Sequence, residues 1–176
     1  MKSSSAAITK LPKFLSRLQI SLFDPYQLFI KEVHLETESK DYNACYFKLK
    51  NKNVVFRTAK TTPKKIGQFV TLWKRNKNGP IEPFRFQESA DLYIIETINR
   101  NQIGYFLFAK EILNEKGILF GKHKGKRGFR VYPSWDKPKN KQGNTTQIWQ
   151  IPYFHEIIEN RQELNTLKKQ LEIFIK

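Results

Sequence analysis

Apolar residues near the N-terminus recur at intervals of three and four. This spacing is typical of an amphipathic helix that buries one face. The positions are Leu11, Phe14, Leu15, Leu18 and Leu22. The dipeptide Asp24-Pro25 predicts the end of that helix. A shorter apolar segment with Phe29, Val33 and Leu35 follows it, and residues 1–40 are expected to form an N-terminal helical region.

Two pairs of short apolar and aromatic runs follow. Residues 44–49 and 54–59 are separated by Lys50-Asn51-Lys52-Asn53, and this pattern predicts a β-hairpin. The asparagines are expected to adopt the left-handed turn conformation. Residues 91–98 and 103–108 form a second pair of the same kind around residues 99–102. We therefore expect two hairpins in one sheet.

The segment between these hairpins has two interpretations. Thr61-Thr62-Pro63 resembles a helix start, with a threonine cap and proline in the first helical position. Apolar residues then recur at helical spacing from Ile66 to Trp73 and favour a helix with a lysine-rich polar face. A strand through residues 69–73 is the competing interpretation, because β-branched and aromatic residues dominate there. Asn76 to Pro80 end the element in either case.

The C-terminal half contains fewer apolar signals. We expect a short helix over residues 110–116, stopped by Gly117, and a long loop over residues 121–147. Residues 153–175 are predicted to form a long helix that packs on the sheet or forms a homodimer seam. The fold class expected is α/β: a single domain over residues 1–176, with a mixed β-sheet flanked by helices and a C-terminal helix over 153–176.

The net charge of the sequence and its distribution indicate a class of partner. The chain has 32 Lys and Arg against 16 Asp and Glu, a net charge of +16. Residues 41–80 contain ten basic side chains against Asp41, and residues 121–150 contain eight against Asp136. Concentrated positive charge favours a polyanionic partner, above all DNA or RNA.

Several other classes of protein are disfavoured. The sequence has no apolar stretch long enough for a membrane span and no signal-peptide pattern, so we expect a cytoplasmic protein without a membrane partner. Cys45, the single cysteine, excludes an internal disulfide framework and a multi-cysteine zinc site. The three histidines have no ligand spacing, and we expect no metal or other cofactor outside the nuclease alternative.

One group of residues resembles a nuclease site. Glu36, Glu38 and Asp41 precede a strand pair that ends in Lys60. This order is similar to the PD-(D/E)xK core, in which two carboxylates hold Mg²⁺ or Mn²⁺ and a lysine orients the attacking water. Thr58 stands where the second carboxylate is expected, so the metal site is interpreted as degenerate, and we assign no catalytic residues. A nuclease using Glu36 or Glu38, Asp41 and Lys60 remains an alternative.

The basic residues instead suggest a phosphate-binding groove with two walls. One wall is predicted to contain Arg57, Lys60, Lys64, Lys65, Lys74 and Arg75. A mobile loop is predicted to close over it with Lys122, Lys124, Lys126, Arg127 and Arg130. Tyr132, Trp135 and Trp149 are candidates for stacking on bases, and core packing is the other interpretation for both tryptophans. Neutral polar side chains able to contact bases or sugars are Gln142, Thr145, Thr146, Gln147 and Gln150.

Several long phrases resemble the MepB family. They are VVFRTAKTTPKKIGQFVTLWKRN (54–76), GYFLFAKEILNEKGIL (104–119), GKRGFRVYPSWDKP (125–138) and TQIWQIPYF (146–154). The resemblance implies a restriction-endonuclease-like α/β core. It carries no catalytic residues over to this chain, because no activity is established for the family.

The leading hypothesis is a nucleic-acid-binding protein on a degenerate nuclease-like scaffold with no intact metal site. A metal-dependent nuclease is the first alternative. The second is a protein-interaction module that acts through the C-terminal helix. The sequence leaves open whether DNA or RNA is preferred.

Overall fold

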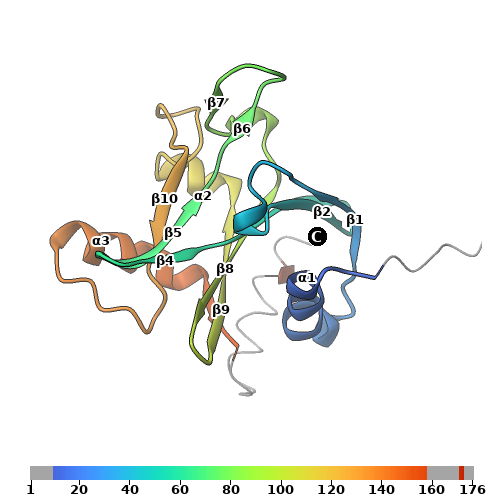
Figure 1. Ribbon diagram of the computed structural model, residues 1–176, viewed down its shortest axis with the longest axis horizontal. Coiled ribbons are helices and arrows are strands. Elements are labelled where there is room, and N and C mark those ends of the chain that lie inside the picture. Colours follow the sequence, from blue (N-terminus) through green and yellow to red (C-terminus); the bar gives the residue numbers. More distant parts are fainter. Residues whose placement is uncertain (1–9, 158–170, 173–176) are drawn as a thin grey trace, which may run out of the picture.

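The core of the fold is a six-stranded mixed sheet (Figure 1). In the computed structural model, which describes residues 10–157, 171 and 172, the strands lie in the order β1-β2-β3-β8-β9-β11. β3 and β8 are parallel, and every other neighbouring pair is antiparallel. The bounds are Ile30–Leu35 (β1), Cys45–Leu49 (β2), Lys52–Thr58 (β3), Leu92–Asn99 (β8), Gln102–Ala109 (β9) and Phe154–Glu156 (β11). The predicted mixed sheet and both predicted hairpins are confirmed. The residues in the left-handed conformation at the two turns are Lys50 and Arg100, rather than the neighbouring asparagines.

A second, three-stranded sheet leads out of the first. β3 passes through Ala59 into β4 (Lys60–Thr62), which pairs with β5 (Lys65–Thr71), and β5 pairs with β10 (Gly128–Val131). The helix predicted to start at residues 61–63 is therefore wrong, and the competing strand interpretation is right. β10 pairs antiparallel with residues 68–71 of β5 and β4 pairs on its other side, and this pairing outweighs the helical spacing of the apolar residues. A short hairpin of β6 (Lys74–Arg75) and β7 (Ile81–Glu82) follows.

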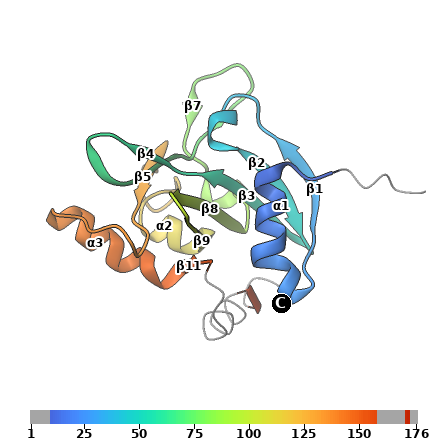
Figure 2. The ribbon, with the colours of Figure 1, turned by 60° about the horizontal axis from the view of Figure 1, so that its bottom comes forward.

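Both faces of the central sheet are buried. Helix α1 (Lys13–Leu18) continues as a π-helical turn, Gln19–Phe23, and a 3-10 turn, Asp24–Tyr26, and its apolar side covers one face (Figure 2). The second sheet and α2 (Lys110–Glu115) cover the other face. Neighbouring residues of one strand enter opposite cores, as Ile94 and Ile95 do. This explains why β3, β8 and β9 appear in the sequence as continuous apolar runs.

The N-terminal amphipathic helix and the helix before Gly117 agree with prediction. The region predicted as helical over residues 1–40 is helical only as far as Tyr26 in the described residues, and β1 follows. The long loop predicted for residues 121–147 is wrong, because it contains β10 and the start of α3 (Lys141–Gln150). Asn140 caps α3 by accepting a hydrogen bond from the Gly143 backbone at 2.7 Å. α3 has no apolar stripe, so its sequence did not indicate a helix.

The start of the predicted C-terminal helix is also wrong. Ile151–Tyr153 form a 3-10 turn, and β11 adds to the edge of β9. Leu171 and Glu172 are helical, and Leu171 is buried in the core beneath α1. The rest of that predicted helix, with its dimer seam, lies outside the described residues. None of the helices that the structure describes is long and apolar enough to cross a bilayer.

A buried carboxylate connects α1 to the sheet. The Glu96 side chain is fully buried and accepts hydrogen bonds from Arg17 at 2.7 and 3.0 Å and from the Thr58 hydroxyl at 2.9 Å. Tyr105 donates a further bond at 3.3 Å. Burial, together with the charge of Glu96, raises the pKa of Tyr105 to about 12, so this phenol stays protonated and acts as a donor.

We predict that Arg17→Ala lowers the free energy of unfolding by about 3 kcal/mol, because it leaves the buried Glu96 carboxylate without its cation. Urea denaturation followed by circular dichroism measures this change. Lys48→Ala is the matched control: its ion pair with Glu32 is exposed, so the loss should stay below about 1 kcal/mol. Equal losses in both variants would contradict the prediction.

Candidate nucleic-acid interface

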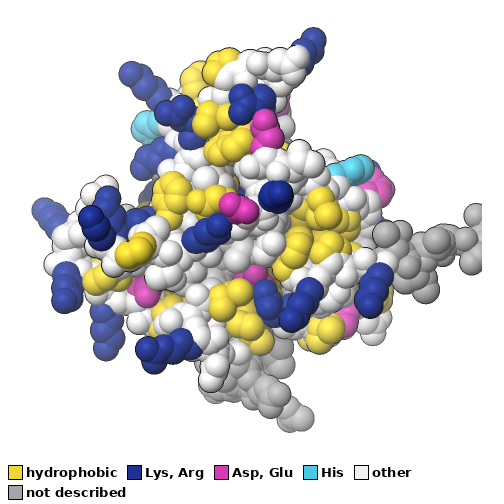
Figure 3. Space-filling view, in the orientation of Figure 1, with side chains coloured by type: hydrophobic (Ala, Val, Ile, Leu, Met, Phe, Trp, Pro, Cys, Tyr) yellow, Lys and Arg dark blue, Asp and Glu magenta, His cyan; other side chains and the backbone are white. Residues whose placement is uncertain are grey.

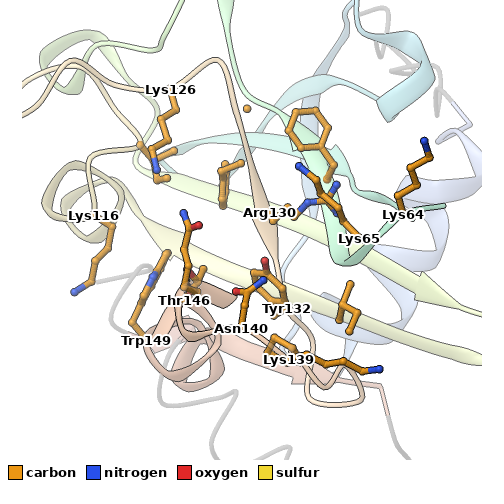
Figure 4. Close-up of a pocket in the computed structure, with 17 residues that line it drawn as sticks. Lys64, Lys65, Lys116, Lys126, Arg130, Tyr132, Lys139, Asn140, Thr146 and Trp149 are labelled. Atoms are coloured by element: carbon orange, nitrogen blue, oxygen red, sulfur yellow. Dashed lines mark hydrogen bonds between the residues drawn. The ribbon is translucent and has the colours of Figure 1, made fainter. Parts of the chain in front are cut away.

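A hollow of about 710 Å³ lies between the β4–β5 hairpin, β10, the end of α2 and α3 (Figure 4). We call it the basic cleft, because every charged residue that lines it in the described part of the chain is positive. These residues are Lys64, Lys65, Lys116, Lys126, Arg130 and Lys139. Figure 4 shows Lys64 and Lys65 on one side, Lys116 and Lys126 on the other, and Arg130 between them.

The pairing of β5 with β10 brings the two basic blocks of the sequence together. Arg130 lies opposite Phe69 in the antiparallel register, although the two residues are far apart in the chain. Of the predicted groove residues, the structure gathers Lys64, Lys65, Lys126, Arg130 and Tyr132 around the cleft. The predictions did not include Lys116, which lies in a net-acidic part of the sequence, or Lys139.

Arg130 fixes the β4–β5 hairpin against β10. Its guanidinium donates to the Gly67 carbonyl at 2.9 Å and to the Thr62 hydroxyl at 2.7 Å, and it lies 5.9 Å from the centre of the Phe69 ring. Gly67 has φ +84°, and a Cβ there would lie 2.6 Å from Cε1 of Tyr132. Only glycine allows the hairpin and Tyr132 to approach so closely.

One face of α3 supplies uncharged groups to the cleft. Gln142, Thr146 and Trp149 are spaced by four and three residues, so they lie on one side of the helix. Trp149 is half-buried: its ring packs 5.5 Å from Phe108 in the core and also lines the cleft. Both interpretations of Trp149, core packing and a place at the binding surface, therefore hold in part.

The predicted neutral and aromatic candidates that do not line the cleft are four: Trp135, Thr145, Gln147 and Gln150. Trp135 packs edge-on against Phe154 at 5.3 Å and does not line the cleft. Gln147 donates to the carbonyls of Pro133 and Asp136. Gln150 is buried. Its side-chain oxygen accepts a hydrogen bond from the Tyr132 amide, and its side-chain nitrogen donates to the Arg130 carbonyl.

Arg57 must be removed from the predicted groove. Its side chain is 1% exposed and donates to Glu36 at 2.7 Å and to the Phe56 carbonyl at 2.8 Å. Burial and this ion pair prevent a surface phosphate from reaching it. Arg57 is a structural cation within the core.

Three other predicted cations lie outside the cleft and are paired with acidic groups. Lys74 lies 2.6 Å from Glu88, and Arg75 lies 2.8 Å from Glu38. Lys60 lies 4.0 Å from Asp41 and 4.8 Å from the centre of the Tyr42 ring. The first wall of the predicted groove is thus divided, and Lys64 and Lys65 are its members at the cleft.

The segment predicted to be the mobile loop of the second wall is held to the rest of the fold by backbone hydrogen bonds. The Lys126 amide donates to the Ile118 carbonyl at 2.8 Å, and the Arg127 carbonyl accepts from Leu72 at 2.9 Å. Lys122, Lys124 and Arg127 have exposed side chains. Figure 3 shows Lys and Arg side chains spread over the side of the molecule that carries α3 and the β4–β5 hairpin, with few Asp or Glu among them.

The carboxylates of the nuclease alternative do not converge. Glu36 bonds Arg57, Glu38 bonds Arg75, and Asp41 lies by Lys60. The Thr58 hydroxyl does meet a carboxylate, that of Glu96, which the pattern did not single out as its partner. Within residues 10–157, 171 and 172, no three His, Cys, Asp or Glu side chains come together to hold a metal ion.

Comparison with known proteins gives two kinds of similarity. A family model described as MepB-like matches residues 36–156. The crystal structure of MepB is similar over 85% of this chain and 100% of its own, with 37% sequence identity and a TM-score of 0.73. A bacterial homing endonuclease, I-Ssp6803I, shares 10% identity over 77% of this chain and 84% of its own, with a TM-score of 0.41. The sequence matches none of the curated proteins.

We predict that Arg130→Lys loosens the β4–β5 hairpin, because lysine cannot make both of the bonds that the guanidinium makes. Amide hydrogen exchange in β4 and β5 should become about fivefold faster, since a net hydrogen bond contributes about 1 kcal/mol. Amides in β8 and β9 should keep their protection. Arg127→Lys is the control, because the exposed Arg127 side chain makes no hydrogen bond or ion pair within the described residues. An unchanged hairpin in Arg130→Lys contradicts this role.

Proposed function

Because the chain belongs to the MepB-like family, and the matched region contains every residue that lines the basic cleft, we propose that it binds nucleic acid through that cleft. The observation that carries the proposal is the set of six basic side chains, with no acidic one among the described lining residues, around a hollow of about 710 Å³. A concave surface of one charge focuses the field and attracts a polyanion more strongly than the same charges spread apart.

The remaining lining of the cleft supports nucleic acid over a simple polyanion. Asn140, Gln142 and Thr146 offer neutral donors and acceptors of the kind that contact sugars and base edges. Tyr132 and Trp149 add aromatic surface beside the cations, and bases stack on such surface with little dependence on sequence. The charges account for affinity, and the neutral groups account for selection of a nucleotide polymer.

The proposal is one of binding without strand cleavage. Each carboxylate of the candidate nuclease site faces a basic side chain of the same chain, and Arg57 and Glu36 are held together within the fold. These pairs would have to be broken before the carboxylates could share a metal ion. Under this proposal, the residues of the nuclease-like pattern form ion pairs within the fold, and the binding surface lies on the second sheet and α3.

Binding is expected to depend steeply on salt. If about six phosphates are neutralised, affinity should fall by about three decades between about 50 and 200 mM salt, because bound counterions are released. Fluorescence anisotropy with a labelled oligonucleotide measures this dependence. The double variant Lys64→Ala with Lys65→Ala should weaken binding and reduce the slope of log affinity against log salt by about two.

The matched control removes two exposed lysines elsewhere, Lys13→Ala with Lys31→Ala, on α1 and β1. It lowers the net charge by the same amount and should leave the slope nearly unchanged. Equal effects of the two double variants would mean that only net charge matters, and would overturn the assignment of the cleft. No binding at low salt would overturn the function itself.

A further inference from the structure

A second hollow adjoins the basic cleft. It has a volume of about 520 Å³, and it is lined by Glu115, Lys116, Gly117, His123, Lys124, Gly125 and Lys126. Lys116 and Lys126 line both hollows. The two hollows therefore meet at a pair of lysines, and Figure 4 shows this pair on the side of the cleft away from Lys64 and Lys65.

We infer that a bound nucleic-acid strand continues past Lys116 and Lys126 into this second hollow, where Lys124 contacts a further phosphate. The inference rests on the proposed function and extends it from a cleft to a two-part path. A path suits an extended polymer, because phosphates recur along the strand and each needs a cation nearby. A mononucleotide would leave Lys124 unused.

The backbone of the second hollow is held in place before any ligand arrives. The Phe120 amide donates to the Phe84 carbonyl at 2.8 Å, and the Lys126 amide donates to the Ile118 carbonyl at 2.8 Å. Gly125 has φ +70°, and a Cβ there would lie 2.7 Å from the Phe120 nitrogen. Lys124 and Lys126, on either side of Gly125, are thus presented from a fixed turn, and ordering it on binding costs little entropy.

The junction between the hollows contains one opposing charge. Glu115 is the only acidic residue among the described residues that line either hollow, and its carboxylate lies 3.2 Å from the Lys116 ammonium. Lys116 also lies 5.9 Å from the centre of the Trp149 ring. An acid at this point repels a passing phosphate and competes with it for Lys116. Its removal should therefore favour a strand that crosses the junction.

The test compares two lengths of fluorescein-labelled oligodeoxythymidylate, about 4 and about 16 nucleotides, on the full chain. Lys124→Ala should reduce the salt slope for the long strand by about one and leave the short strand unchanged. Glu115→Gln should tighten the long strand by about threefold, with a smaller change for the short one. Lys122→Ala is the matched control, because Lys122 is exposed on the same segment and lines neither hollow.

Each outcome decides between the two proposals. If Lys124→Ala has no effect on the long strand, or the same effect as Lys122→Ala, the path is wrong, while binding in the cleft stands as long as the Lys64 and Lys65 double variant weakens both strands. If that double variant weakens neither strand, or no oligonucleotide binds at low salt, the proposed function fails and the path fails with it. A length-dependent effect of Lys124→Ala alone supports the path.

Discussion

The antiparallel pairing of β5 with β10 is the constraint on which the candidate site depends. Four residues of β10, Gly128 to Val131, lie opposite Gln68 to Thr71, and this short ladder joins two parts of the chain that are remote in sequence. It places Arg130 beside Thr62 and Gly67, and so fixes the hairpin that presents Lys64 and Lys65. Without the ladder the cleft would lose two of its walls, and one face of the central sheet would lose the cover that Val70, Phe129 and Val131 provide.

The parts of the fold that could be predicted are those whose signal is local. The β8–β9 hairpin joins strands adjacent in sequence, and α1 buries a stripe of regular period. The two segments whose predicted structure is wrong are the helix beginning at residues 61–63 and the loop over residues 121–147. They contain β5 and β10, which pair with each other. The helical spacing from Ile66 to Trp73 was genuine, but a distant strand supplied backbone partners that a helix would not need.

The candidate site was predictable in kind and only partly in membership. The two basic blocks indicate a basic surface, and eight of the predicted residues, four of them basic, line the cleft. Charge alone could not separate Arg130, which faces the cleft, from Arg57, which is sealed beneath the surface by Glu36. Both follow a phenylalanine within a strand, and they differ in the sheet and the face of the sheet that they occupy. Lys116 gives no such signal because it lies in a net-acidic part of the sequence, yet in the fold it lines the cleft with five other basic residues while keeping its ion pair with Glu115.

The exposed lysines of the cleft are expected to lower the stability of the protein when no polyanion is bound. Lys64, Lys65, Lys126 and Lys139 lie around one hollow, and none has an acidic partner within the described residues. In the folded state they repel one another, a penalty that the more expanded unfolded chain largely escapes. Salt or a bound polyanion reduces that repulsion, so each is expected to raise the free energy of unfolding. The same lysines therefore determine both the stability of the fold and its affinity for a polyanion.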